Sequence, residues 1–182
     1  MSGKVDGRGQ AKILSGYELD RLISVTKDPY RLAIAIAAYT ACRMSEAIAL
    51  KAENLKNDAI VFTRTKTGET RAVPMHPKLK ALLADYNLPK RGYLFPSSGG
   101  KALPHITRQS VDKELRAAAV DLGIEGIGTH SFRRTALTAM KDAGTPLANI
   151  AAISGHKSLN ELARYLDVSE SDKIGAIATL PY

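Results

Sequence analysis

The stretch "PYRLAIAIAAYTACRMSEAIALKAENL", residues 29–55, joins a strongly apolar pattern to an abrupt polar interruption. Alanine, leucine and isoleucine fill most of its first half, which is typical of a buried helix. The pattern breaks near residues 42–45, so it predicts one or two apolar helices that are interrupted there. Arg43 lies at the break, where a long cation is costly to bury unless an anion meets it.

The segments around this stretch predict a mainly α domain with a small antiparallel β-sheet, an α+β fold. Residues 14–25 begin a helix, because Ser15 and Glu18 have the spacing of a capping box. Residues 58–75 change to two β-branched runs on either side of a Thr-Gly-Glu turn, which predicts a β-hairpin or a small sheet. Further helical patterns cover residues 77–86, 107–122, 131–143, 145–156 and 159–166.

The chain divides into one domain and two short ends. Residues 1–12 are glycine-rich and polar without periodicity, so we expect a flexible N-terminal segment. Residues 13–166 contain the periodic segments and form the expected domain. Residues 167–182 form a C-terminal tail that includes the apolar run "IGAIATL".

Composition indicates a soluble globular protein with an anionic partner. The 182 residues suit one domain, and no apolar run reaches the roughly 18 residues of a membrane-spanning helix. The start of the chain has no apolar signal core and Cys42 is the single cysteine, so we expect a cytoplasmic protein without internal disulfides. The net charge of +8 favours a polyanion as partner, nucleic acid before an anionic membrane.

The first polar cluster is in "TACRMSEAIAL", residues 40–50. Arg43 and Glu46 are three residues apart and therefore share one helix face. An exposed ion pair of this kind is worth about 0 to 1 kcal/mol. The spacing alone favours such a surface pair, whereas the apolar surroundings of Arg43 point to a buried anionic partner.

The second polar cluster is in "GTHSFRRTALTAM", residues 128–140. His130 is near the start of a predicted helix, and Arg133 and Arg134 follow it by three and four residues. Either arginine can share the face of the histidine. The spacing alone favours a capping histidine with two solvated arginines, but an imidazole and a guanidinium can also converge on one phosphate.

The turn of the predicted hairpin carries the third cluster, "RTKTGETR", with Arg64, Lys66 and Arg71. A hairpin tip of this charge fits a plain solvated turn. It also fits a finger that reaches DNA and delivers an ammonium group to a scissile phosphate. Spacing leaves this choice open.

A lone tyrosine is near the end of "GHKSLNELARYL", residues 155–166. Leu159, Leu162, Ala163 and Leu166 have the spacing of a buried helix face. Tyr165 falls roughly 110° from the middle of that face, at the flank of the helix. Taken alone, this position favours a half-buried surface tyrosine.

Together these motifs resemble those of the tyrosine recombinases, the phage integrase family. "TACRMSEAIAL" is similar to the box one motif and "TRTKTGETRAVPM" to the lysine-bearing hairpin. "GTHSFRRT" resembles the H-x-x-R motif, and "ISGHKSLNELARYL" resembles the G-H…Y motif. The motifs follow in the family order over about residues 14–166. The resemblance implies the tyrosine recombinase catalytic-domain fold, also called the DNA breaking-rejoining enzyme fold.

The resemblance also implies a role for each matching residue. Arg43 and Arg133 match the two arginines that clamp the phosphate, which selects Arg133 over Arg134, and Glu46 matches the acidic residue that supports Arg43. The remaining catalytic positions are Lys66 as general acid, His130 and His156 as the motif histidines, and Tyr165 as nucleophile. The expected DNA-binding residues are Arg64, Arg71, Arg134 and Lys157.

The implied activity is site-specific DNA recombination. The hydroxyl of Tyr165 attacks a DNA phosphodiester, which gives a 3′-phosphotyrosyl link and a free 5′-hydroxyl. The sequence has no cluster of carboxylates suited to Mg²⁺, and the resemblance implies rejoining without metal, other cofactor or ATP. The implied partner is double-stranded DNA, with a homotetramer on DNA and a monomer compatible with the DNA-free protein.

Several alternatives stay open at this point. A type IB topoisomerase uses a similar residue set to relax DNA, and a non-catalytic DNA-binding regulator can retain the fold. Most family members carry a further N-terminal helical domain, so the chain corresponds to a catalytic domain alone or to a short member that resembles the fimbrial-switch invertases. Its tail docks either on its own domain or on a neighbouring protomer.

Overall fold

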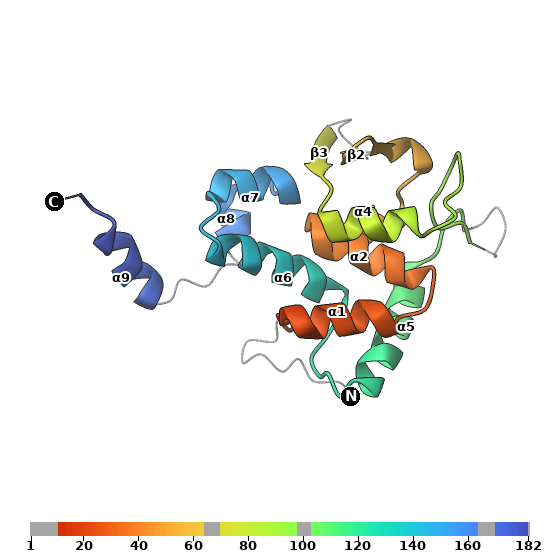
Figure 1. The fold of residues 1–182 in the computed structure, drawn as a ribbon, viewed down its shortest axis with the longest axis horizontal. Coiled ribbons are helices and arrows are strands. Elements are labelled where there is room, and N and C mark those ends of the chain that lie inside the picture. The colour runs from red at the N-terminus through yellow and green to blue at the C-terminus, as the bar shows by residue number, and fades with distance from the viewer. Residues whose placement is uncertain (1–10, 64–69, 98–102, 164–169, 182) are drawn as a thin grey trace.

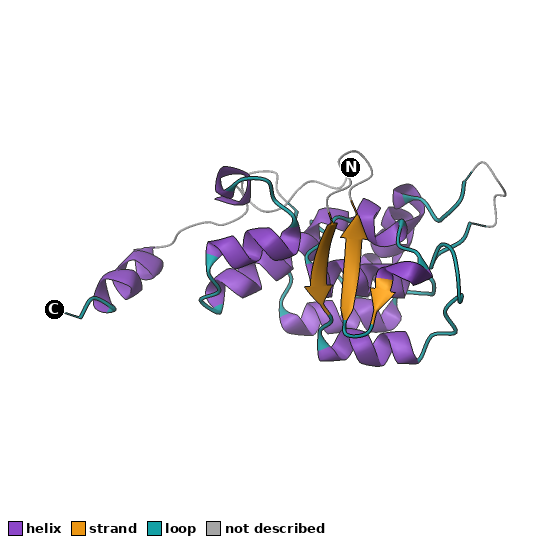
Figure 2. Ribbon diagram, turned by 90° about the horizontal axis from the view of Figure 1, so that it is seen from above, coloured by secondary structure: helices purple, strands orange, loops and turns teal. Residues whose placement is uncertain are grey.

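The computed structural model describes residues 11–63, 70–97, 103–163 and 170–181. Helices dominate these ranges, and a three-stranded antiparallel sheet of order β1-β2-β3 lies against them (Figures 1 and 2). The expected mainly helical α+β fold is therefore confirmed. The elements are α1 (Gly16–Val25), α2 (Tyr30–Thr40), α3 (Met44–Ile48), the 3₁₀ helix η1 (Ala52–Asn54), β1 (Leu55–Lys56), β2 (Ala59–Thr63), β3 (Thr70–Pro74), α4 (Pro77–Ala84), α5 (Arg108–Asp121), α6 (Thr129–Asp142), α7 (Leu147–Ser154), α8 (Leu159–Ala163) and α9 (Glu170–Ala178).

Helix α2 is at the centre of the main hydrophobic core. Leu32, Ile34 and Ile36 are completely buried, and α2 packs against α1, α3, α4, α5 and α6. Because the helix is apolar on every face, its neighbours can cover all of its sides. It ends at Ala41, which has a left-handed φ of 54°, and Arg43 is the N-cap residue of α3. The apolar stretch thus forms two helices with the break where the sequence predicts it.

Strands β2 and β3 confirm the predicted hairpin. They pair in antiparallel register, and Thr63 opposes Thr70. Ile60 and Phe62 are buried, so alternate positions of β2 face the core. Residues 64–69, which include the predicted site residues Arg64 and Lys66, lie outside the described residues.

A second, smaller group of buried residues joins α6, α7 and α8. Leu162 is completely buried there, whereas Leu159 is 51% exposed and Ala163 is exposed as well. The prediction that these three share a buried face with Leu166 is therefore wrong for Leu159 and Ala163. Because α8 is a short helix of about one turn, Leu162 is the position that points to α7 and α6. Leu166 and Tyr165 lie outside the described residues.

The N-terminal contacts of the domain begin before the expected boundary at residue 13. The Lys12 N–H donates to the Gly126 carbonyl at 3.0 Å. Arg134 Nη1 donates to the Ala11 carbonyl at 2.6 Å, and the Leu14 N–H donates to Thr135 Oγ1 at 2.9 Å. Residues 11–14 are thus fixed along α6 by hydrogen bonds, which the polar composition of this segment does not predict.

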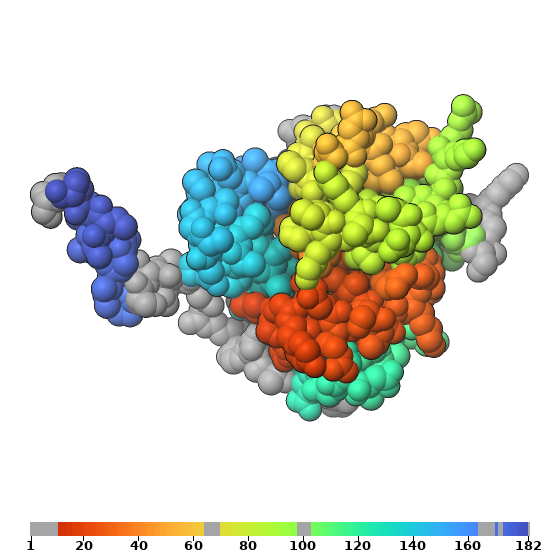
Figure 3. Space-filling model, in the orientation of Figure 1, coloured from red at the N-terminus to blue at the C-terminus, as the bar shows by residue number. Residues whose placement is uncertain are grey.

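At the other end of the chain, α9 lies apart from the remaining helices (Figures 1 and 3). Its apolar residues Ile174 and Ile177 are 67% and 69% exposed, and Leu180 beyond it is 45% exposed. These side chains give the tail an apolar surface. None of the helices in the described part of the chain combines the length and the apolar character that crossing a membrane requires.

Candidate active site

Arg133 of α6 is the largest fully buried side chain among the described residues, with 2% of its surface exposed. Its Nη1 donates to the carbonyls of Ala41 and Ser154, both at 2.7 Å. These carbonyls are at the C-terminal ends of α2 and α7, where backbone oxygens have no partner within the helix. The guanidinium therefore satisfies two helix ends and holds them together, which offsets the cost of burying its charge.

His156 contacts the same guanidinium. It follows Gly155, the left-handed C-cap of α7 with φ 72°, and its Nε2 lies 3.0 Å from Arg133 Nη2. Ser154 Oγ donates to the Ile150 carbonyl at 2.6 Å and lies 2.7 Å from His156 Nδ1. Because the Ser154 hydroxyl donates its proton to Ile150, its oxygen can only accept from His156. The Nδ1–H of His156 therefore donates to Ser154, and Nε2 accepts from Arg133.

The surroundings of His156 keep its imidazole neutral. Burial first, and then the positive charges of Arg133 and Arg43, lower the pKa of His156 to about 4. At neutral pH the ring can therefore exchange hydrogen bonds with a phosphate or a hydroxyl without carrying a charge of its own.

This pKa predicts a pH dependence of stability. As the pH falls from 6.5 to about 4, the unfolded chain takes up a proton that folded His156 does not bind, so the free energy of unfolding decreases. Between pH 7 and pH 4.5, we expect the free energy of unfolding of His156→Gln to fall by roughly 1 kcal/mol less than that of wild type. This figure is reduced for the partial solvent exposure of the imidazole. Urea unfolding of both proteins at both pH values measures this difference. Equal losses in the two proteins contradict the prediction.

Arg43 and Glu46 occupy the first turn of α3. The Arg43 N–H donates to Glu46 Oε2 at 2.7 Å, and Glu46 Oε1 accepts from Arg71 Nη1 at 2.8 Å. Burial alone would raise the pKa of Glu46, but the hydrogen bonds from Arg71 and the Arg43 backbone lower it, and the carboxylate stays ionised. Glu46 thus holds the backbone of Arg43 and the side chain of Arg71 together.

His130 is in the first turn of α6 and its side chain is exposed. Its pKa is lowered by desolvation first and then by the charges of Arg108, Arg133 and Arg43. The charges of Arg43 and Arg133 thus act on both motif histidines. Of the four residues Arg43, His130, Arg133 and His156, the structure shows Arg133 of α6 and His156 after α7 in direct contact.

Two of the residues expected to bind DNA, Arg134 and Arg71, contact other groups of the protein. Arg134 is 7% exposed and holds the Ala11 carbonyl, so its guanidinium is directed to the N-terminal segment. The Arg71 side chain is 14% exposed and bonds Glu46 and the Ile153 carbonyl. Lys157, in contrast, is exposed.

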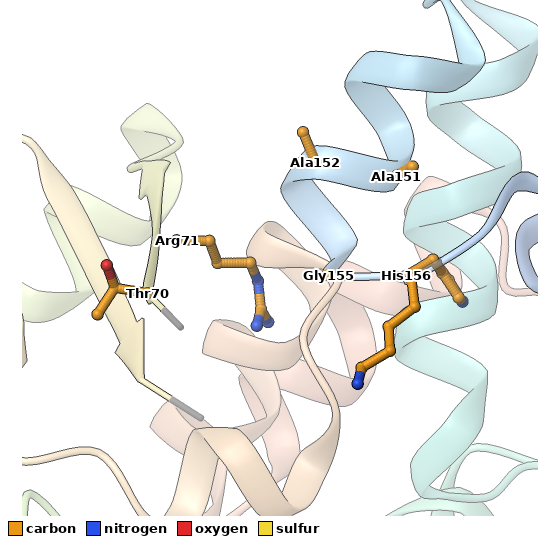
Figure 4. A pocket seen from close by; sticks show the side chains of 7 residues that line it. Thr70, Arg71, Ala151, Ala152, Gly155 and His156 are labelled. Carbon is orange, nitrogen blue, oxygen red and sulfur yellow. The ribbon is translucent and has the colours of Figure 1, made fainter. Parts of the chain in front are cut away.

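An open cavity of about 510 Å³ lies between β3 and α7 (Figure 4). Arg71 extends into it from the strand, and Gly155 and His156 form its other side. The remaining lining residues are Thr70, Ala151, Ala152 and Lys157. Within the described ranges, no three His, Cys, Asp or Glu side chains are grouped so as to hold a metal ion.

This arrangement has the chemistry of an anion site. Arg43 and Arg133 carry fixed positive charge, and this charge helps to lower the pKa of the His130 and His156 imidazoles. Preorganised cations and hydrogen-bond donors of this kind stabilise the charge that develops on an oxyanion.

The family model for the phage integrase family matches residues 12–172 of the chain. The chain belongs to the phage integrase family. The match covers all four motifs of the sequence, and the expected catalytic-domain fold is confirmed by the likeness to solved integrase structures.

Two curated relatives in the family are longer than this chain. Tyrosine recombinase XerD of Bradyrhizobium diazoefficiens is 26% identical over 93% of this chain and 63% of its own length. The integrase of Escherichia phage P2 is 30% identical over 79% of this chain and 39% of its own length. The chain thus spans less than two thirds of the length of these relatives.

The catalytic domain of bacteriophage HP1 integrase matches almost end to end. It is 25% identical with a TM-score of 0.69, and the match covers 94% of this chain and 96% of that domain. XerA recombinase has the same fold, with a TM-score of 0.74 at 22% identity over 94% of this chain and 66% of its own. The integrase fold of this chain therefore corresponds to the catalytic domain of the longer proteins.

Two residues of the candidate site differ from the sequence-based prediction: Ser154 was not predicted, and Arg71 was predicted to bind DNA. Ser154 supplies a carbonyl to Arg133 and a hydroxyl to His156. A polar residue at the end of an apolar helix, directly before Gly-His, is the signal that could have identified it. No local signal distinguishes Arg71 from the other cations of the hairpin.

Proposed function

We propose that residues 13–166 form the catalytic domain of a site-specific recombinase that cleaves and rejoins double-stranded DNA. The observation that carries the proposal is the group formed by Arg43, His130, Arg133 and His156, which suits a phosphodiester. Family membership supports it. Two neighbours with the same fold provide further support: XerH is bound to difH in a pre-cleavage complex, and the Tn1549 transposon integrase is bound to circular intermediate DNA.

In the proposed reaction, Tyr165 Oη forms a bond to phosphorus as the bond from phosphorus to the 5′-oxygen breaks. Only about one free tyrosine in a thousand is ionised at pH 7, so the attack needs a group that removes the proton. Arg43 and Arg133 neutralise the nonbridging oxygens, and the neutral imidazoles of His130 and His156 can exchange protons nearby. Lys66 gives a proton to the departing 5′-oxygen. The roles of Tyr165 and Lys66 rest on the motif resemblance.

Rejoining reverses these steps with a 5′-hydroxyl from another strand. The phosphotyrosyl ester conserves the energy of the broken bond, so the proposed cycle consumes no ATP and needs no metal or other cofactor. The net charge of +8 supports backbone affinity with a steep salt dependence, and Arg64 and Lys157 are the proposed DNA contacts. Glu46 is the proposed support of Arg43.

The proposed assembly is a homotetramer on DNA in the cytoplasm. The exposed apolar residues of the tail, Ile174, Ile177 and Leu180, support its packing on a neighbouring copy. In the proposed assembly, the tail links the catalytic domains of adjacent protomers.

Covalent trapping tests the proposal. A nicked duplex that loses a short fragment after cleavage prevents rejoining, and a denaturing gel separates the protein–DNA adduct. We expect an adduct that forms in EDTA and depends on the target sequence. Plasmid relaxation without site preference would instead indicate a type IB topoisomerase. DNA binding with no adduct on any substrate would indicate a non-catalytic regulator.

The general-acid role of Lys66 predicts a rescue experiment. Lys66→Ala is expected to slow cleavage by about 10²- to 10⁴-fold, because the 5′-oxygen leaves without a proton. A 5′-phosphorothiolate substrate replaces that oxygen with sulfur, a better leaving group, and is expected to restore the rate. Single-turnover cleavage of both substrates measures the effect. A variant that stays slow on the phosphorothiolate contradicts this role.

A further inference from the structure

Arg71 connects three elements of the fold from strand β3. Its Nη1 donates to Glu46 Oε1 at 2.8 Å, its Nε donates to the Ile153 carbonyl at 3.0 Å, and its guanidinium carbon lies 4.5 Å from the centre of the Phe62 ring. Glu46 belongs to α3, Ile153 to α7 and Phe62 to β2. Figure 4 shows the side chain crossing from the strand to the turn after α7.

The turn at Gly155 is shaped around this guanidinium. A Cβ at Gly155 would lie 2.8 Å from Arg71 Nη1 and 2.9 Å from Cζ, closer than real Cβ contacts. Gly155 also has a φ of 72°, which other residues rarely adopt. Glycine at this position thus permits both the left-handed turn and the close approach of Arg71, directly before His156.

Two arginines from different elements share the end of α7. Arg71 binds the carbonyl of Ile153, and Arg133 binds the next carbonyl, that of Ser154, at 2.7 Å. The last carbonyls of a helix lack intrahelical partners and carry the negative end of its dipole, so cations stabilise them there. The position of His156 therefore depends on both guanidinium groups.

We propose that Arg71 is a positioning residue of the strand-transfer site: through Glu46 it fixes the start of α3 at Arg43, and through Ile153 it fixes the turn that presents His156. This inference rests on the proposed function. It assigns Arg71 to the support of Arg43 and His156 rather than to a direct contact with DNA.

The test compares Arg71→Ala and Arg71→Lys with Arg116→Ala. Arg116 is an exposed arginine of α5 that is paired with Asp112 at 2.7 Å, so its removal changes the net charge equally. Single-turnover adduct formation at increasing DNA concentration separates the rate at saturation from the half-saturating concentration. Thermal unfolding monitors the fold of each variant.

We expect Arg71→Ala to lower the saturating rate by about 10²-fold, the cost of misplacing catalytic groups by about 1 Å, with the half-saturating DNA concentration nearly unchanged. Arg71→Lys is expected to recover part of the rate, because lysine keeps a charge for Glu46 but lacks the planar fork that reaches Ile153 as well. Arg116→Ala is expected to match wild type.

For Arg71→Ala, a higher half-saturating DNA concentration with an unchanged saturating rate overturns the proposal in favour of direct DNA contact. If Arg71→Ala does not fold, Arg71→Lys is the deciding variant, and a wild-type rate in it overturns the proposal.

A second readout does not require activity. The imidazole signals of His156, followed by NMR in the DNA-free protein through a pH titration, are expected to move in Arg71→Ala and to stay in place in Arg116→Ala. Unchanged His156 signals in Arg71→Ala overturn the positioning role even if no adduct forms. The two ideas can also fail separately. If the wild-type protein forms no adduct, the proposed function is contradicted. If the His156 signals nevertheless move in Arg71→Ala, the structural link from Arg71 to His156 is still supported.

Discussion

Tyr165→Phe is expected to abolish the covalent protein–DNA adduct on a nicked trapping substrate. The substitution removes a single oxygen and keeps the aromatic ring. Without the hydroxyl, no bond to phosphorus can form at this position. Denaturing gels with labelled DNA measure the adduct, and gel shifts measure the retained binding.

Tyr17→Phe is the matched control for this experiment. Tyr17 is 71% exposed on α1, and its hydroxyl accepts a hydrogen bond from Arg21. Its loss is expected to leave adduct formation at the wild-type level. An adduct that persists in Tyr165→Phe means that another residue attacks the phosphate, and the nucleophile assignment is then wrong.

Arg133→Ala is expected to lower both adduct formation and stability. The substitution leaves the buried carbonyls of Ala41 and Ser154 unpaired, at a cost of about 1–3 kcal/mol for each group. It also removes a preorganised donor from the phosphate, a loss of about 10²- to 10³-fold in rate. Thermal unfolding and single-turnover cleavage measure the two effects separately.

Arg133→Lys and Arg134→Ala separate catalysis from folding in this experiment. Lysine keeps a charge at residue 133 but cannot reach two carbonyls and His156 with one planar fork, so the rate is expected to stay low. Arg134→Ala removes the neighbouring guanidinium, which holds Ala11, and is expected to cost stability with a smaller change in rate. Wild-type cleavage by Arg133→Lys contradicts the clamp role of Arg133.

Sequence motifs predicted part of the candidate site. The motif resemblance identified His130, Arg133 and His156 as members of one site, and the structure describes His156 in direct contact with Arg133. The adjacent arginines 133 and 134 could not be separated by spacing, because neighbouring positions on a helix differ by about 100° in direction and either can face a histidine. The packing of α6 against α2 and α7 turns Arg133 to the helix ends, and Arg134 faces the N-terminal segment instead.

The exposure of Leu159 and the inward direction of Arg71 were not predictable for a related reason. The amphipathic pattern of α8 indicates which side chains share a face, but the extent to which that face is covered depends on α6 and α7. A charged hairpin likewise contains no sign that one of its cations has an acceptor on another element. Arg71 is 25 residues from Glu46 and 82 residues from Ile153 in the chain.

Helices, the hairpin and the order of the motifs follow from the sequence, because helical and strand periodicities and capping preferences act over a few residues. The direction of each cation follows from the fold, because a buried charge is stable only where acceptors from distant segments meet it. Arg133 finds these acceptors at the ends of α2 and α7, and Arg71 finds them at Glu46 and Ile153. Packing therefore supplies the cations of separate motifs with acceptors on distant segments of the chain.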